Sequence, residues 1–338
     1  MNERVWPSVS VVIPAYSMQR WPLIRRGVES VRNQSVPVDA VVLAVDDNPE
    51  LLAAAESEWG ERAGVTVRVI ASRPPEGRVA GSRDGAARGF GAGVTRNAGA
   101  ASVESEIVAF IDDDAWAEPD WLEQLLPLYR DPAVVAVGGA SLPDYETGRP
   151  GWFPPNFDWI FGCSYSGLPS TTAPLRRLLG PSMTVRRDAF AAVGGFRVEP
   201  HVRAGEGDRA ILALDDMSLS LLLEARYGVG SMYYEPRAVV HHYVASERVT
   251  WRYFCRRAYL VNREKARLFD ELGSAASLGA ERAFVARVVS RQALAEARRA
   301  LAGEPAGLLS LGAMLAGTAL AGAGYLHGYA EKLLPASR

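Results

Sequence analysis

The amino-acid sequence predicts an α/β protein whose parallel or mixed sheet carries helices on both faces. Short apolar runs such as 9–13 (VSVVI) and 40–45 (AVVLAV) have the length and composition of strands buried on both faces. Segments with helical spacing separate these runs, and this strand–helix order favours parallel neighbours in one sheet. Acidic clusters directly follow two of the predicted strands. Because ligands of such sheets bind beyond the carboxyl ends of the strands, we expect the functional site there.

The first half of the chain supplies most of the predicted sheet. We expect strands at 9–13, 40–45, 65–71, 107–111 and 134–138. Helical spacing predicts helices at 23–31, 49–59, 93–101 and 118–129. The stretch 73–93 is rich in Gly, Pro and Arg, which is typical of a loop.

The second half is less regular. Periodicity is lost between 143 and 174, and long loops of this kind are usually functional. Order returns with strands at 182–185, 230–234 and 238–244 and a helix at 217–227. From Arg248 to Arg299 the pattern is helical, with 12 Lys/Arg against 5 Asp/Glu. We therefore expect two domains, a catalytic domain at 1–245 and a basic helical extension at 246–338.

Composition excludes several classes of protein. The 338 residues are 48% hydrophobic and 22% charged, which is typical of globular protein and excludes disorder and a polytopic membrane protein. A net charge of −2 argues against a nucleic-acid partner. Cys163 and Cys255 are too few for a disulfide framework, so we expect a reducing compartment. The first residues show no apolar secretory segment, so we expect no secretory signal.

The strongest candidate for chemistry is Asp112-Asp113-Asp114, directly after the strand at 107–111. Alternate side chains of an extended chain point the same way, so Asp112 and Asp114 can share one divalent cation. Carboxylate oxygens suit Mg²⁺ or Mn²⁺ bridging to a diphosphate. The alternative is helix capping, in which the acids interact with a helix dipole. Mutual repulsion of three acids favours the cation.

Two further acidic pairs occupy similar positions. Asp46-Asp47 follows the strand at 40–45 and can accept hydrogen bonds from a base or ribose at the sheet edge. An Asx turn before Pro49 is the alternative. Asp215-Asp216 opens the helix at 217–227, where the dipole keeps a carboxylate ionised and able to act as a base. Plain N-capping is the alternative there.

The remaining candidates are basic side chains. His241-His242 can supply a metal ligand, although such a pair is often structural. Arg96 can direct its guanidinium at a diphosphate, and a surface arginine is the alternative. The glycine-rich stretch 89–93 lacks the Lys-Ser/Thr of a phosphate-binding P-loop and carries little weight.

Seven segments occur in an order typical of a known family. They are VSVVIPAY, VLAVDDN, GVTRNAG, FIDDD, GPSMTVRRDAF, LDDMSLSLLLE and VVHHYV. Over residues 8–265 the sequence resembles a family 2 glycosyltransferase of the GT-A fold, of the type that acts on lipid-linked or cell-surface polysaccharide acceptors. The resemblance implies the GT-A nucleotide-sugar-binding mixed sheet with helices on both faces, followed here by a C-terminal helical extension.

The resemblance also implies roles in donor binding. Tyr16 and Asp47 would hold the base of a nucleotide sugar, with Arg96 close to the base or to the diphosphate. Asp114 would ligate Mn²⁺ or Mg²⁺ directly, and Asp112 would contact ribose or a metal-bound water and so contribute to the metal site. The usual Gly-Ser or Asn-Ser after the first acidic pair is Asn48-Pro49 here.

The acceptor side follows from the same resemblance. Asp216 matches the general base that deprotonates the acceptor hydroxyl in an inverting displacement, and His242 fits the position that completes the metal shell, although His241 stays open for that role. Asp215 stands where the family often has Glu, and we count it among the substrate-binding residues. Trp159 belongs to an aromatic loop that forms either an acceptor platform or a core lid.

The sequence therefore predicts an inverting, metal-dependent glycosyltransferase. The expected partners are a nucleotide-sugar donor, with a UDP-sugar favoured, and a glycan or polyprenyl-linked sugar acceptor. One alternative is a phosphotransferase with Asp112 as nucleophile and Asp114 as acid, although that class wants Thr or Val where Trp116 stands. The other alternative is an inactive membrane-associated scaffold of the same fold.

The C-terminal segment bears on membrane contact. Residues 307–330 are uncharged and long enough to span a bilayer, but they are rich in Gly and Ala. Small residues also pack helices together, so insertion, interfacial docking and a soluble helical hairpin all remain open. With the basic helix before it, the region 248–330 is the expected membrane contact, at the inner face of the cell membrane.

Overall fold

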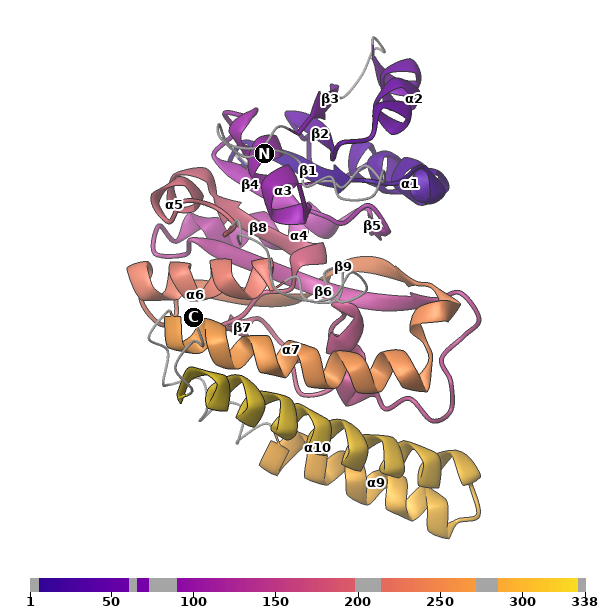
Figure 1. Ribbon diagram of the computed structural model, residues 1–338. Helices are drawn as coiled ribbons and strands as arrows, with labels where there is room; N and C mark the ends of the chain where they lie inside the picture. Colours follow the sequence, from indigo (N-terminus) through magenta and orange to yellow (C-terminus); the bar gives the residue numbers. More distant parts are fainter. Residues whose placement is uncertain (1–5, 61–65, 73–89, 198–213, 272–284, 334–338) are drawn as a thin grey trace, which may run out of the picture. The chain divides into compact units, whose positions relative to one another are not determined.

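The computed structural model describes residues 6–60, 66–72, 90–197, 214–271 and 285–333. Within these residues a nine-stranded mixed sheet has the order β3-β2-β1-β4-β8-β6-β9-β5, with β7 paired to β9 (Figure 1). The strands are β1 Val9–Ala15, β2 Ala40–Val45, β3 Val67–Ala71, β4 Ile107–Phe110, β5 Ala115–Ala117, β6 Ala136–Tyr145, β7 Ala173–Pro174, β8 Met183–Arg186 and β9 Met232–Val244.

The α-helices lie in both halves of the chain. They are α1 Trp21–Arg32, α2 Pro49–Trp59, α3 Ala92–Ala101, α4 Trp121–Leu125, α5 Arg187–Ala192, α6 Asp215–Tyr227, α7 Trp251–Glu271, α9 Ser290–Leu301 and α10 Pro305–Leu333. Shorter 3₁₀ segments are η1 Met18–Arg20, η2 Leu126–Arg130, η3 Pro155–Phe161, η4 Gly180–Ser182 and η6 Ser246–Arg248, and η7 Val285–Val289 is π-helical.

The chain divides into two compact units, described separately below. The sheet unit comprises Met1–Leu142, Pro169–Pro200 and Asp215–His242. The helical unit comprises Pro143–Leu168, His201–Leu214 and Tyr243–Arg338. The expected division into a catalytic domain at 1–245 and a helical extension at 246–338 concerns function and stays a prediction.

Parallel pairing of β3, β2, β1 and β4 builds the half of the sheet whose carboxyl ends carry the acidic clusters. Two apolar clusters cover the faces, and helices contribute to both, as in the expected GT-A architecture. Ile24 and Val28 of α1 pack on one face, whereas Leu219 and Leu223 of α6 belong to the other. At Gly99 of α3 a Cβ would overlap the side chain of Val12, so glycine allows the helix to lie close to β1.

The antiparallel half brings distant segments to the same edge. β8 pairs with β4 on one side and with β6 on the other. β5 pairs with β9 so that Ala115 lies opposite His242 and Trp116 opposite His241. This register places the end of β9 beside the acidic segment that precedes β5.

The helical unit has its own aromatic core. Phe153, Phe157 and Phe161 from the region of η3 pack with Phe254 of α7 and with Met314 of α10. Phe153 and Phe161 stack with ring centroids 4.9 Å apart. Asp158, almost fully buried, accepts hydrogen bonds from Arg149 and from the Tyr145 hydroxyl, and this network fixes the irregular segment. The segment that lacks periodicity is therefore an ordered part of a core.

Several elements differ from the sequence expectation, among them β6, which extends to Tyr145, and the unexpected β7 and α5. Three other differences have a local reason. The two strands expected at 230–234 and 238–244 form one strand, β9, because the buried Glu235 between them is paired with Arg237 and Thr172. The three-residue β5 is too short to give a sequence pattern. The helix expected at 118–129 begins at Trp121 and becomes 3₁₀ at Leu126. The loop expected at 73–93 lies mostly outside the described residues.

Candidate functional site

Tyr16 and Asp47 follow β1 and β2 at the carboxyl edge of the sheet. Both residues are exposed, and Tyr16 retains 53% of its accessible surface. Asn48 joins the two loops, because its Nδ2 donates to the Tyr16 carbonyl at 3.0 Å while its Oδ1 caps α2. Asp47 has a φ of 43°, a left-handed conformation uncommon for a residue other than glycine. Such strain is often found at ligand-binding positions.

Asp46, the other member of the Asp46-Asp47 pair, has a structural role. Its buried carboxylate accepts hydrogen bonds from the amides of Phe90 and Gly91 and from the Ser72 hydroxyl. These bonds tie β2 and β3 to the start of α3. Asp46 therefore positions the segment that carries Arg96, and Asp47 is left exposed at the edge.

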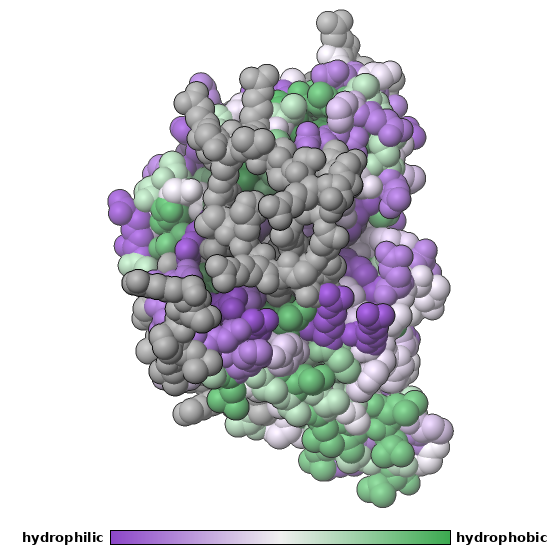
Figure 2. Space-filling model, viewed as in Figure 1, coloured by the Kyte–Doolittle hydropathy of each residue, from purple (hydrophilic) through white to green (hydrophobic). Residues whose placement is uncertain are grey.

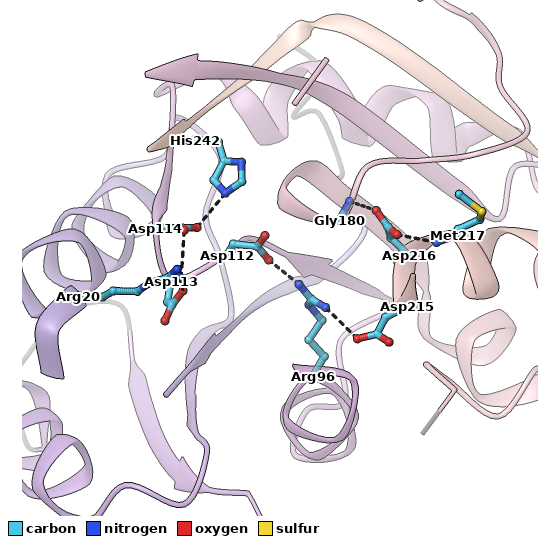
Figure 3. A network of polar contacts seen from close by, with 10 residues as sticks. All are labelled: Arg20, Arg96, Asp112, Asp113, Asp114, Gly180, Asp215, Asp216, Met217 and His242. Carbon is cyan, nitrogen blue, oxygen red and sulfur yellow. Dashed lines mark hydrogen bonds and ion pairs between the residues drawn. The ribbon is translucent and has the colours of Figure 1, made fainter. Parts of the chain in front are cut away.

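Asp112, Asp114 and His242 form a cluster able to hold a metal ion, with one ligand atom from each within 4.8 Å of the others. His242 Nε2 lies 2.9 Å from Asp114 Oδ1, and both side chains are buried (Figure 3). The neighbouring His241 contacts Glu118 at 2.6 Å instead. Two carboxylates and one imidazole are a donor set that Mn²⁺ or Mg²⁺ accepts.

Charge balance around this cluster fits a cation. Three carboxylates, Asp112, Asp113 and Asp114, face two guanidinium groups, those of Arg20 and Arg96. Burial, the largest effect, and the adjacent Asp114 together raise the pKa of Asp113 to about 7 against the opposing effect of Arg20. Asp113 Oδ2 is buried and has no hydrogen-bond partner among the described residues. The residues present therefore suit an added divalent ion.

Arg20 connects the two ends of the site. Its Nη1 lies 2.5 Å from Asp113 Oδ1 and 3.0 Å from Asp114 Oδ2. Its guanidinium also lies over the Tyr16 ring, 4.9 Å from the centroid. Interaction with the two carboxylates raises the pKa of Arg20 despite the opposing effect of burial, so the side chain stays charged.

Arg96 of α3 bridges the metal cluster to α6. Its Nη2 lies 2.5 Å from Asp112 Oδ1 and its Nη1 lies 3.7 Å from Asp215 Oδ2 (Figure 3). The guanidinium is almost fully buried and lies 5.3 Å from the centroid of Phe196. One fixed cation therefore holds carboxylates from two acidic clusters in place.

Asp216 is held by backbone amides at the start of α6. Oδ2 accepts from the Gly180 amide at 3.0 Å, and Oδ1 accepts from the Met217 amide at 2.7 Å. Burial raises the pKa of Asp216, and the two amides and Arg96 act in the opposite direction. A Cβ on Gly180 would lie 3.6 Å from Asp216 Oδ2 and 3.7 Å from Arg96 Nη2, so these groups meet around this glycine. Asp216 is half-buried, and a partly desolvated carboxylate of raised pKa is suited to accept a proton.

Trp159 belongs to the helical unit, where Lys265 lies over its ring at 5.3 Å from the centroid. Its neighbours in the aromatic loop are mostly core residues, since Phe153 and Phe157 are buried in the apolar cluster of that unit. Of the two alternatives for this loop, these buried rings support the core role. A sugar-binding role for the half-buried Trp159 stays a prediction.

The structure brings together Asp112, Asp114, His242, Arg96, Asp215 and Asp216, and places Tyr16 and Asp47 at the ends of adjacent strands. Sequence reasoning missed Arg20 and Gly180, and it named Asp113 only as a member of the acidic cluster. Arg20 and Asp113 form an ion pair across 93 positions, and Gly180 acts through its amide. Only the location of Gly180 within the GPSMTV segment could have drawn notice to it.

Comparison with known proteins shows which sequences this chain resembles. A family model described as glycosyl transferase family 2 matches residues 10–194. A glucosyl-dolichyl phosphate glucuronosyltransferase of Haloferax volcanii is 34% identical over 205 residues. That alignment covers 59% of this chain and 60% of the relative, so the chain spans less than two thirds of the relative's length.

A solved structure shows the same fold. The mannosyltransferase PcManGT from Pyrobaculum calidifontis, solved in complex with GDP-Man and Mn²⁺, matches with a TM-score of 0.55 and 20% identity. The match covers 99% of this chain and 89% of that chain. At this identity the likeness concerns the fold alone.

Proposed function

The chain belongs to glycosyl transferase family 2, and we propose that it moves a sugar from a nucleoside-diphosphate sugar to a hydroxyl group of a lipid-linked acceptor. The transfer is inverting and depends on a divalent cation. Family membership argues against the phosphotransferase alternative, in which Asp112 would be a nucleophile. The contact of Asp112 with Arg96 argues against it as well.

The donor lies across the carboxyl edge of the sheet. Tyr16 and Asp47 contact its base, with a UDP-sugar the favoured donor, and their exposure leaves them accessible. Asp112, Asp114 and His242 hold Mn²⁺ or Mg²⁺, which when bound neutralises the charge that develops on the diphosphate leaving group. Arg96 keeps Asp112 oriented toward that site.

Asp216 is the general base. It removes the proton from the acceptor hydroxyl while the hydroxyl oxygen bonds to the anomeric carbon and the bond to the diphosphate breaks. The attack comes from the face opposite the leaving group, so the configuration inverts. Hydrogen bonds from the Gly180 and Met217 amides orient the carboxylate, and its raised pKa makes it a stronger base than an exposed aspartate.

The acceptor is a sugar linked to a lipid phosphate. Support comes from the name of the Haloferax volcanii relative, which acts on a glucosyl-dolichyl phosphate. The basic region 248–330 contacts the membrane that holds such a lipid, and we place the reaction at the cytoplasmic face of the cell membrane.

The observation that carries the proposal is the clustering of three ligand atoms, from Asp112, Asp114 and His242, within 4.8 Å. The test is a thermal-shift panel of UDP- and GDP-sugars with Mn²⁺ or EDTA, followed by mass spectrometry after incubation with dolichyl-phosphate-linked sugars. Stabilisation by one nucleotide sugar only with Mn²⁺, together with a product heavier by one sugar, supports the proposal. Metal-independent binding without product would contradict it.

A further inference from the structure

Helix α10 exposes a continuous apolar stripe along the helical unit. Residues spaced three or four apart face solvent, namely Leu308, Gly312, Leu315, Ala319, Gly322, Leu326 and Ala330. Leu308, Leu315 and Leu326 each retain more than 60% of their accessible surface, at 64%, 65% and 68%. Figure 2 shows apolar surface gathered where α9 and α10 lie. Exposed apolar surface of this extent marks an interaction site.

The opposite face of α10 packs against other residues of the helical unit. A Cβ on Gly317 would lie 2.6 Å from Phe157 and Phe254, and one on Gly324 would overlap the Tyr259 carbonyl of α7. Near the C-terminal end Glu331 pairs with Arg263 and Arg267, and both arginines lower the pKa of Glu331. From Gly317 to Glu331, α10 is therefore packed against α7 and the aromatic core.

This packing limits how α10 can interact with a membrane. By length and composition alone, Pro305–Glu331 could span a bilayer, with a mean hydropathy of 1.6 over a window that is 28% buried. Spanning would pull α10 from α7, uncover the aromatic core and break the ion pairs of Glu331. Each large apolar side chain so exposed to water costs about 1.5–3 kcal/mol. The geometry favours a helix that lies along a surface.

The outer face of α9 adds positive charge. Arg287 of the preceding η7 and Arg291, Leu294, Arg298 and Leu301 of α9 are spaced as one helical stripe, and all five are exposed. Leu301 retains 89% of its surface. Arg287, Arg291 and Arg298 have no ion-pair partner within the part of the chain that the structure describes. A stripe of leucine and arginine complements an apolar layer covered by anionic headgroups.

A second copy of the chain fits this surface less well. In a two-fold contact the same patch faces itself. The arginines of α9 would then approach their own copies without a carboxylate among the stripe residues to pair with. Anionic lipid is the occupant whose charge matches.

We propose that the α9–α10 hairpin docks flat on an anionic bilayer, with the leucines of both helices entering the headgroup boundary and the arginines of α9 binding lipid phosphates. α10 does not cross the bilayer. This inference deepens the membrane contact of the proposed function and rests on it only for the presence of a membrane. The donor chemistry in the sheet unit is independent of it.

The test is co-sedimentation of the full chain with phosphatidylcholine vesicles and with vesicles that also contain phosphatidylglycerol. We expect binding to the anionic vesicles, weaker in ~1 M than in ~0.1 M NaCl because salt screens the arginines. The triple variant Leu301→Gln/Leu308→Gln/Leu315→Gln should lose about tenfold or more of the partition coefficient. Arg291→Gln/Arg298→Gln should abolish the preference for anionic lipid. Val229→Gln, at an exposed position of the sheet unit, is the matched control and should bind like wild type.

Three outcomes would overturn the proposal. If the leucine variant bound vesicles as well as wild type does, the leucine stripe would have no role in membrane binding. Protein that alkaline carbonate fails to extract from membranes would indicate a spanning helix. A dimer that dissociates in the leucine variant, without vesicle binding by wild type, would assign the surface to a second copy. Circular dichroism and the thermal shift given by UDP with Mn²⁺ check each variant for intact folding. They also separate failure at the lipid surface from failure of the proposed donor site.

Discussion

The imidazole of His242 lies 2.9 Å from the carboxylate of Asp114, although 128 positions separate the two residues. The pairing of β5 with β9 creates this contact, since Ala115 lies directly opposite His242. His241 faces the other way, stacks on Trp116 and contacts Glu118. Two adjacent histidines therefore have separate environments, and the difference can be measured.

Asp114→Asn and His242→Asn should each weaken Mn²⁺-dependent binding of UDP by roughly 10–100-fold, because each removes a ligand or the group that orients it. Isothermal titration with and without Mn²⁺ measures this. His241→Asn is the matched control and should change the affinity less than threefold or so. Equal effects of the two histidine variants would remove His242 from the proposed metal site.

Asp216→Asn should lower the transfer rate by about 10²–10⁴-fold while leaving donor affinity unchanged, because it removes the base and no donor contact. The melting temperature should stay level or rise, since burial raises the pKa of Asp216 and so disfavours its ionised form. Product formation and thermal unfolding are the two measurements. Asp215→Asn, which faces Arg96, is the comparison variant. Near-normal turnover of Asp216→Asn would refute the base assignment.

Activity should fall as the pH is lowered through the pKa of Asp216, because protonation removes the base. Burial raises this pKa above 3.8, so the loss occurs at a higher pH than for an exposed aspartate. Arg96 opposes the rise. Arg96→Gln should therefore shift the acidic limb of the kcat/KM profile to still higher pH. An unchanged or lowered limb would show that another group controls the profile.

The carboxyl edge of the sheet could be predicted because apolar runs stop abruptly at acidic residues. β2 and α2 lie at their predicted positions, since the apolar run ends at Val45 and Asn48 caps the following helix. The convergence of separate acidic clusters also followed from strand order, because parallel strands end at one edge. The chemical roles of Asp47, Asp112 and Asp216 stay predictions.

Other parts of the site depend on tertiary contacts that leave no local pattern. Arg20 lies where a surface arginine would, and only folding brings it to Asp113. Gly180 acts through a backbone amide, which every residue except proline possesses. Aromatic composition could not separate core from platform, because a ring such as Phe157 buried beneath a helix has the same sequence signature as one that stacks on a sugar.

Arg20→Gln should destabilise the sheet unit by about 1–3 kcal/mol at neutral pH, because it leaves the buried Asp113 and Asp114 without their cation. Saturating Mn²⁺ should restore part of the loss by neutralising the same carboxylates. Urea unfolding with Mn²⁺ and with EDTA measures both effects. Arg25→Gln, which removes an exposed pair with Glu58, should cost less than about 1 kcal/mol. Equal losses of unfolding free energy for the two variants would show that the Arg20 ion pairs stabilise the protein no more than an exposed pair does.

Gly324→Ala and Gly322→Ala provide a matched test of the α7–α10 contact, because the two glycines lie two positions apart in one helix. A methyl group at 324 would overlap the carbonyl of Tyr259, whereas nothing lies within 4 Å of one at 322. Gly324→Ala should therefore destabilise the helical unit by about 1–3 kcal/mol through overpacking. Gly322→Ala should stabilise it by up to about 1 kcal/mol, because alanine loses less backbone entropy in a helix. Chemical unfolding monitored by circular dichroism, with no lipid present, measures both changes. Similar effects of the two substitutions would mean that α10 does not pack against α7 in solution, and the exposed stripe would then lose the fixed geometry on which surface docking depends.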